Sequence, residues 1–117
     1  MLLSIIIPTY NEVDQLKYTI KKLQSLQKKI YNYELIFIDD LSGDGSYNEL
    51  IKFKKKYSKV KVYKNLKKGL GSAIKLGIEK SNKKYVCIFM CDLSDDVNDI
   101  HKYYKIMTNN QNLDAVL

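Results

Sequence analysis

The chain has 117 residues, 45% of them hydrophobic, and no long tract rich in Gly, Pro or polar residues, so we expect a single compact domain over residues 1–117. Its 20 Lys and Arg residues exceed its 13 Asp and Glu residues, and the net charge of +7 would suit nucleic acid, an anionic membrane surface or a phosphate-bearing ligand. The sequence has no secretory signal and no apolar stretch of about 20 residues, which predicts a cytoplasmic protein that does not cross a membrane; contact with a membrane surface stays open.

Short apolar runs alternate with segments of helical periodicity along the chain, a pattern typical of α/β proteins. The first run, residues 2–7, is continuous and rich in β-branched residues, as expected for a strand covered on both faces, and Pro8 ends it. Apolar residues then recur every three or four positions from Val13 to Leu23, which predicts a helix with one buried face. Residues 33–38 form the second predicted strand.

The second helix is expected to begin at Ser46, which has the spacing of a capping box with Glu49. A short third strand over residues 60–63 leads to a third helix. That helix has an apolar inner side with two small residues, which would let it approach the sheet closely. The inner side consists of Leu70, Ala73, Ile74, Gly77 and Ile78.

The fourth predicted strand, residues 85–91, is the most apolar stretch of the chain, which indicates a central position, and it ends at Asp92. The inner face of the helix that follows consists of Val97, Ile100, Tyr104 and Met107. Strands joined by helices in this way are parallel and have right-handed crossovers. We therefore predict a doubly wound, mostly parallel, Rossmann-like α/β sheet of strand order 3-2-1-4 with helices on both faces.

More than half of the 13 acidic residues fall in the loops that follow the first, second and fourth predicted strands. The carboxyl ends of parallel strands meet at one edge of a sheet, where open α/β folds bind ligands. Carboxylates gathered there repel one another unless a cation intervenes, and a divalent metal such as Mg²⁺ takes such oxygen ligands together with substrate phosphates. Taken singly, each acid has a structural explanation too, as a helix cap or a turn residue. The acids are Glu12, Asp39, Asp40, Asp44, Asp92, Asp95 and Asp96.

Residues near the first and second strand ends suit a nucleotide. The carboxylates of Asp39 and Asp40 could accept hydrogen bonds from a nucleobase N–H or from ribose hydroxyls, and Tyr10 could stack on the base. A tyrosine directly after a strand is also often a half-buried core residue. The loop of residues 67–71 lacks the Gly-Lys-Ser/Thr ending of a P-loop, so its glycines are explained equally well by ligand contact and by a tight turn into the helix.

Four segments match one known family in order and spacing. They are residues 4–12 (SIIIPTYNE), residues 34–46 (ELIFIDDLSGDGS), Asn65 with residues 69–71 (GLG), and residues 92–96 (DLSDD). On these segments the chain resembles the inverting family-2 glycosyltransferases of GT-A fold, and most closely their dolichol-phosphate mannosyltransferase-like branch. The resemblance covers essentially the whole chain, and the four motifs together are specific where each alone would be weak.

The resemblance implies transfer of a sugar from a UDP- or GDP-sugar with the help of Mg²⁺ or Mn²⁺. In the branch that the chain resembles, the acceptor is a polyprenyl phosphate at a membrane surface. The resemblance also implies a nucleotide-sugar site with three parts. These are Pro8, Tyr10 and Glu12 along the nucleotide, Ile38 and Asp40 beside the base, and Cys91 and Asp92 at the metal and diphosphate position.

Two positions depart from the family pattern. Met90 stands where the family commonly has the first acid of an Asp-x-Asp metal motif. Asp92 is then expected to hold the metal against the diphosphate, with Asp95 or Asp96 as the replacement ligand. Leu41 replaces the glycine or serine that often follows the paired aspartates.

Family members continue past the strand that residues 114–117 would begin, into a segment with acceptor-site residues. We therefore interpret the chain as the donor-binding part, either truncated at its C-terminus or naturally short, and without an assigned catalytic residue. We expect it to bind nucleotide better than it catalyses transfer. A non-catalytic nucleotide-sugar-binding module is one alternative, favoured by Met90. A nucleic-acid-binding domain is another, but only the net charge suggests it. The acidic edge argues against it, so we expect no nucleic acid partner.

Overall fold

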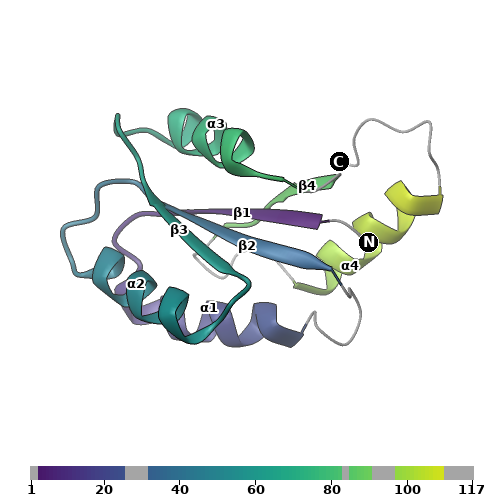
Figure 1. Cartoon of the computed structure of the whole chain (residues 1–117), viewed down its shortest axis with the longest axis horizontal. Helices are drawn as coiled ribbons and strands as arrows, with labels where there is room; N and C mark the ends of the chain where they lie inside the picture. The colour runs from purple at the N-terminus through teal and green to yellow at the C-terminus, as the bar shows by residue number, and fades with distance from the viewer. Residues whose placement is uncertain (1–2, 26–31, 83–84, 91–96, 110–117) are drawn as a thin grey trace.

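The computed structural model of the chain describes residues 3–25, 32–82, 85–90 and 97–109. Strands and helices alternate along these residues, as the sequence predicts (Figure 1). None of the helices in these ranges is long and apolar enough to span a membrane. The elements are β1 (Leu3–Thr9), α1 (Val13–Gln24), β2 (Tyr33–Asp39), α2 (Ser46–Lys56), β3 (Val60–Lys64), α3 (Leu70–Lys80), β4 (Tyr85–Ile88) and α4 (Val97–Asn109).

The strands are parallel and lie in the order β3-β2-β1-β4, which confirms the predicted order. β1 and β2 occupy the middle of this sheet and are buried at every position, as the continuous apolar sequence of β1 predicts for that strand. β1 pairs with β2 from Leu3↔Tyr33 to Thr9↔Asp39. The carboxyl ends of β1 and β2 are therefore side by side.

Helices cover both faces of the sheet, with α1 and α2 below it in Figure 1 and α3 above it. Because side chains alternate along a strand, Ile5 of β1 joins the larger apolar cluster with Leu16 and Ile20 of α1. Ile6 points the other way, into a smaller cluster with Ala73 of α3. Each fully buried Leu or Ile contributes roughly 1.5–3 kcal/mol, so these clusters hold the three layers together.

Helix α3 approaches the sheet closely because small residues face it, as predicted. A Cβ atom at Gly77 would overlap the fully buried side chain of Ile6. The predicted inner side is wrong in part, however, because Leu70 and Ile78 are 51% and 50% exposed. Ala73 and Gly77 are the buried residues of α3, so the contact is narrow and the larger residues stay at its margins.

β4 differs from the sequence prediction in length and in position. Its pairing with β1 ends at Ile6↔Ile88, and β4 lies at the end of the described sheet rather than in its centre. The Ile6 carbonyl accepts the Phe89 N–H at 2.9 Å, so the even-numbered residues of β1 direct their backbone N–H and C=O groups toward β4. The next even-numbered residue is Pro8, which has no N–H to donate to β4. On one face of β4, Val86 and Ile88 are 43% and 44% exposed.

A buried carboxylate connects three strands of the sheet. Glu34 of β2 is 3% exposed. Its carboxylate accepts hydrogen bonds from Ser4 Oγ at 2.6 Å, Lys61 Nζ at 2.5 Å and the Asn82 backbone N–H at 3.0 Å. Burial raises the pKa of Glu34, but these hydrogen bonds outweigh it and hold the pKa below its ordinary value of 4.5. Glu34 is therefore charged in the folded chain at neutral pH.

We expect Gly77→Ala to lower the free energy of unfolding by roughly 1–3 kcal/mol, because the added methyl group displaces Ile6 in a filled core. Gly71→Ala in the same helix is the matched control, since a Cβ atom there would meet nothing within 4 Å. The control should be neutral or slightly stabilising because alanine is the better helix former. Urea unfolding measures both. A Gly77→Ala variant as stable as the wild type would contradict the close packing of α3 on β1.

Stability should depend on pH through Glu34, with a defined sign. Because the folded pKa of Glu34 is lowered, its contribution is present above pH 4.5 and is lost as the pH falls through the folded pKa. Glu34→Gln should therefore lower the free energy of unfolding at pH 7 by roughly 1.5–3 kcal/mol. The deficit should shrink as the pH falls below 4.5 and through the lowered pKa of Glu34, in a series of urea unfolding curves.

The matched control for this series is Glu49→Gln. Glu49 forms an exposed ion pair with Lys52 on one helix, and its loss should change stability by about 0.5 kcal/mol or less. Equal effects of Glu34→Gln and Glu49→Gln at pH 7 would show that the buried cluster adds nothing beyond a surface ion pair.

Candidate functional site

The loops that follow β1, β2 and β3 lie together at one end of the sheet, on the left in Figure 1. The strand registers cause this, because Thr9, Asp39 and Lys64 are partners across β1, β2 and β3. β4 runs beside β1 in the same direction, so its carboxyl end points the same way. The described part of this end is termed the carboxyl rim and comprises residues 9–12, 40–46 and 65–69.

The first two loops of the carboxyl rim are joined by reciprocal hydrogen bonds. The Asn11 N–H donates to Ser42 Oγ at 2.9 Å, and the Gly43 N–H donates to Asn11 Oδ1 at 2.9 Å. Asn11 and Leu41 have φ values of 51° and 61°, a left-handed conformation that Asn adopts more readily than Leu. Leu41 is therefore strained, at the position where the family it resembles often has glycine, and the surrounding bonds hold it there.

The carboxylate of Asp44 holds the starts of helices α1 and α2. The Val13 N–H donates to Oδ2 at 3.2 Å, and Ser46 donates to Oδ1 through its N–H at 3.0 Å and its hydroxyl at 2.5 Å. Ser46 Oγ in turn accepts the Glu12 N–H at 3.0 Å. The capping box predicted to begin at Ser46 is wrong, because Gly45 precedes the helix and Asp44 supplies the acceptor. Desolvation raises the pKa of Asp44, but these hydrogen bonds outweigh it and lower the pKa.

Asp40 connects the end of β2 to the loop between β3 and α3. It is 8% exposed, and its Oδ1 accepts hydrogen bonds from Asn65 Nδ2 and from the Gly69 N–H, both at 2.9 Å. The same Asn65 amide donates to the Lys67 carbonyl at 2.7 Å, which closes the loop on itself. The Asp40 N–H donates to the Thr9 carbonyl at 2.8 Å. Asp40 therefore joins the ends of three neighbouring strands.

Asp39 is a fully buried acid that supports the loop after β2. Its Oδ2 accepts the Ser42 N–H at 3.1 Å, and its carbonyl accepts the Asn65 N–H at 2.8 Å. Its Oδ1 is buried with no hydrogen-bond partner among the described residues. Of the two adjacent aspartates, Asp40 is the more exposed, at 8% against 0% for Asp39.

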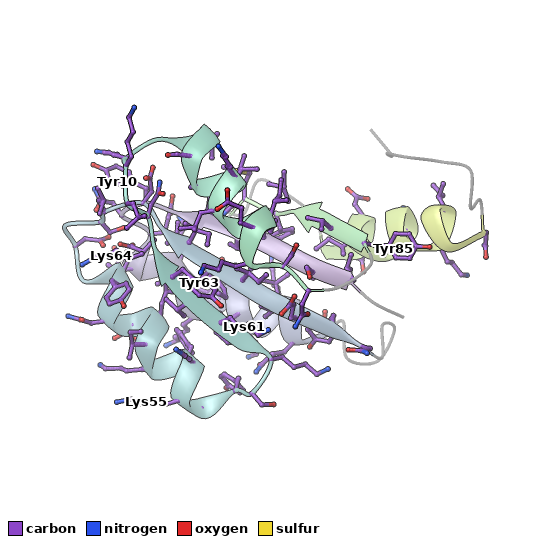
Figure 2. All side chains as sticks on the ribbon, turned by 45° about the horizontal axis from the view of Figure 1, so that its top comes forward. Tyr10, Lys55, Lys61, Tyr63, Lys64 and Tyr85 are labelled. Atoms are coloured by element: carbon purple, nitrogen blue, oxygen red, sulfur yellow. The ribbon has the colours of Figure 1, made fainter. Side chains whose placement is uncertain are left out.

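Tyr10 and Lys68 bridge the first and third loops of the carboxyl rim. Lys68 Nζ donates to the Tyr10 hydroxyl at 2.7 Å and lies 3.9 Å from the centre of its ring, a cation–π contact. Tyr10 is 43% exposed, so its ring belongs to the surface rather than to the core. Figure 2 shows Tyr10 at the end of the sheet where Lys64 ends β3, opposite the end where Tyr85 begins β4.

Five of the residues predicted to bind a nucleotide sugar lie at this end of the sheet, at the carboxyl ends of β1 and β2. Tyr10 is exposed, and Glu12 is half-buried where α1 begins. Pro8 and Ile38 are buried partners in adjacent strands, and Ile38 belongs to the apolar cluster under α3. The five residues are Pro8, Tyr10, Glu12, Ile38 and Asp40.

The predicted metal ligands lie outside the described residues, which stop at Met90 and resume at Val97. Within the described ranges, no three acidic, His or Cys side chains come together as a cation site. Mg²⁺ needs only one or two protein carboxylates, because water and phosphate complete its shell. The absence of a group of three among the described residues therefore does not conflict with the predicted ion, whose predicted ligands belong to residues 91–96. The predicted ligands and their neighbours are Cys91, Asp92, Asp95 and Asp96.

Sequence reasoning gave no structural role to the side chains that hold the carboxyl rim together. Asn11, Ser42 and Asn65 supply many of its hydrogen bonds, but single neutral side chains in loops give little signal. Position is the usable signal, because Asn65 directly follows a strand and precedes a helix-starting glycine, Gly69, by four residues.

The sequence matches known proteins along most of its length. The family model described as "Glycosyl transferase family 2" matches residues 4–117. A poly(ribitol-phosphate) beta-N-acetylglucosaminyltransferase of Staphylococcus aureus is 36% identical over 119 residues, covering 94% of this chain and 34% of the relative. A dolichol-phosphate mannosyltransferase of Pyrococcus furiosus is 26% identical over 113 residues, covering 97% of this chain and 32% of the relative.

The fold is similar to that of a mannosyltransferase from Pyrobaculum calidifontis, solved in complex with GDP-Man and Mn²⁺. The TM-score is 0.78 at 16% identity, covering 90% of this chain and 32% of that one. This likeness confirms the GT-A fold expected from the sequence. The chain spans about a third of the length of these three proteins.

Asn65→Ala should loosen the carboxyl rim, because it leaves the nearly buried carboxylate of Asp40 with one donor fewer. We expect the free energy of unfolding to fall by roughly 1–3 kcal/mol, as for other buried polar groups that lose a partner. Asn48→Ala on α2 is the matched control, since Asn48 is exposed and its loss should change stability by about 0.5 kcal/mol or less. If urea unfolding gave both variants the same stability, Asp40 would not depend on Asn65.

Proposed function

Because the chain belongs to glycosyl transferase family 2, we propose that its carboxyl rim binds the nucleotide of a UDP- or GDP-sugar, as the donor site of a metal-assisted glycosyltransferase. The observation that carries the proposal is that a nearly buried carboxylate, Asp40, and an exposed aromatic ring, Tyr10, belong to one rim. A fixed acceptor and a flat apolar surface are the two features by which pockets recognise a nucleobase.

Asp40 is suited to recognise a nucleobase N–H. Its hydrogen bonds from Asn65 and Gly69 occupy part of the roughly four lone-pair positions of a carboxylate. The remaining capacity can accept the ring N–H of uracil or guanine. The hydrogen bond from the Asp40 N–H to Thr9 fixes the backbone, so little freedom is lost when the base binds.

Tyr10 offers the stacking surface, and Lys68 places a positive charge beside it. A base stacked on Tyr10 takes the position that the Lys68 ammonium holds over the ring in the ligand-free chain. The displaced ammonium then pairs with the diphosphate as a point charge. Lys68 therefore contacts the Tyr10 ring before the nucleotide binds and the diphosphate after it binds.

Residues 91–96 complete the donor site in this proposal. β4 runs beside β1 toward the carboxyl rim, and Asp92 and Asp95 follow it in the sequence. Both carboxylates would hold Mg²⁺ or Mn²⁺, which when bound stabilises the charge that develops on the leaving diphosphate. Support comes from the Pyrobaculum mannosyltransferase, whose structure contains GDP-Man and Mn²⁺.

The acceptor in this proposal is a polyprenyl phosphate at the cytoplasmic surface of a membrane. The named activity of the Pyrococcus relative, a dolichol-phosphate mannosyltransferase, supports this choice. A specific observation favours one alternative, a nucleotide-sugar-binding domain over residues 1–117 without catalysis. Met90 is a half-buried apolar residue at the position where a metal-binding acid is expected.

Titration with UDP and with GDP, each with and without Mn²⁺, tests the donor site. We expect one nucleotide to bind, and Mn²⁺ to tighten its binding roughly tenfold because the ion bridges carboxylate and diphosphate. Asp40→Asn should weaken binding with or without Mn²⁺, since an amide places a donor where the carboxylate accepts. Asp92→Asn should remove only the effect of Mn²⁺. Isothermal titration calorimetry measures each affinity.

Asp14→Asn is the control for these variants, because Asp14 is exposed in the first turn of α1 and outside the carboxyl rim. It should leave both affinities unchanged. Absence of binding by either nucleotide, or binding that Asp40→Asn does not weaken, would refute the site. Metal-independent binding that Asp40→Asn does weaken would favour the non-catalytic domain.

A further inference from the structure

A pocket lies at the opposite end of the sheet from the carboxyl rim. Its volume is about 180 Å³, and it is termed the basal pocket because β2 and β3 begin there and α1 and α2 end there. It is smaller than the roughly 300–1,000 Å³ of sites for whole drug-sized ligands, so it suits one small chemical group. Its polar and aromatic lining consists of Gln24, Tyr33, Lys56, Tyr57, Ser58 and Lys59.

The lining favours a negatively charged group. Lys56 and Lys59 bring two ammonium groups, and no acidic residue is among the described residues that line the basal pocket. The sequence agrees, because the stretches on either side of the lining residues, 15–33 and 50–64, contain no Asp or Glu. Glu34 is the nearest acid in sequence, and its carboxylate is already paired with a lysine of β3.

Aromatic rings orient the two ammonium groups. Lys59 Nζ lies 4.4 Å from the centre of the Tyr33 ring, and Lys56 Nζ lies 5.4 Å from the centre of the Tyr57 ring. Tyr57 is itself stacked on Phe53, with ring centres 6.4 Å apart. Burial raises the pKa of Tyr33, so its hydroxyl keeps its proton as a donor. Side chains positioned in advance lose less freedom when an anion binds.

Helix dipoles explain only part of this positive charge. Helices α1 and α2 both end at the basal pocket, and basic residues in a last turn compensate the partial negative charge of a helix C-terminus. That charge is about half an elementary charge per helix, whereas two lysines, Lys56 and Lys59, line the basal pocket. Lys59 belongs to neither helix, since it directly precedes β3. The positive charge therefore exceeds what the dipoles require.

We propose that the basal pocket binds a phosphate group between the ammonium groups of Lys56 and Lys59, with the Ser58 hydroxyl as a further donor. A phosphate monoester carries about −1.5 to −2 charges at pH 7, which matches two lysines better than a single carboxylate does. The small volume admits the phosphate and leaves the rest of the ligand outside. The phosphate belongs either to a small soluble ester or to a lipid headgroup.

An NMR titration of the chain with inorganic phosphate at constant ionic strength tests the soluble source. We expect saturable shifts confined to amides of the lining, such as Ser58 and Lys59, and roughly tenfold weaker binding by Lys56→Gln/Lys59→Gln. The matched control, Lys54→Gln/Lys55→Gln, removes the same charge from α2 outside the lining. It should bind phosphate within about twofold of the wild type, because solvent and salt screen exposed charges.

Sedimentation with phosphatidylcholine vesicles that contain phosphatidic acid tests the lipid source, because that headgroup is a phosphate monoester. If Lys56→Gln/Lys59→Gln binds the vesicles more weakly than the control variant does, the phosphate belongs to a lipid. If Lys56→Gln/Lys59→Gln is the weaker binder only with inorganic phosphate and not with vesicles, the phosphate belongs to a soluble ester. The proposal is overturned if neither probe binds saturably, if the wild-type shifts fall outside the lining, or if both double variants lose binding equally. The last result would mark unspecific attraction.

Discussion

The hydrogen bonds of Asp40 fix the arrangement on which the candidate site depends. Its nearly buried carboxylate takes donors from Asn65 and Gly69, and its N–H bonds to Thr9. Without those donors, burial of the charge would be strongly unfavourable. The loop after β3 therefore has to close over the end of β2, and this closure leaves an acceptor held in place at the protein surface. The same contacts that stabilise the fold prepare the site.

Much of the fold could be predicted because its signals are local. The continuous apolar runs of β1 and β2 and the periodic face of α1 determine their own burial, and helix-linked parallel strands allow few arrangements. The end of β4 could not be predicted, because it depends on Pro8 in a neighbouring strand. The width of the α3 contact depends likewise on how Gly77 meets Ile6. Both misses are effects of residues far apart in the sequence.

The sequence predicts at which edge of the sheet the candidate site lies, but not which role each acidic residue has there. Parallel topology brings Glu12 and Asp40 to one end of the sheet. Whether a carboxylate faces a ligand or a backbone N–H depends on loop geometry, which turned Asp44 into a cap for two helices. Net charge is equally coarse as a guide, because it does not show that Glu12, Asp40 and Asp44 lie at one end of the sheet and Lys56 and Lys59 at the other.

Pro8 also shapes the tip of the central strand. Pairing of β1 with β2 continues to Thr9, whereas described pairing with β4 stops at Ile6. Those three residues amount to about 10 Å of extended backbone. One absent N–H thus leaves the described ladder on the β4 side of β1 shorter than the ladder on its β2 side. Among the described residues, the tip of β1 is therefore held mainly from the β2 side, where the Thr9 carbonyl also accepts the Asp40 N–H.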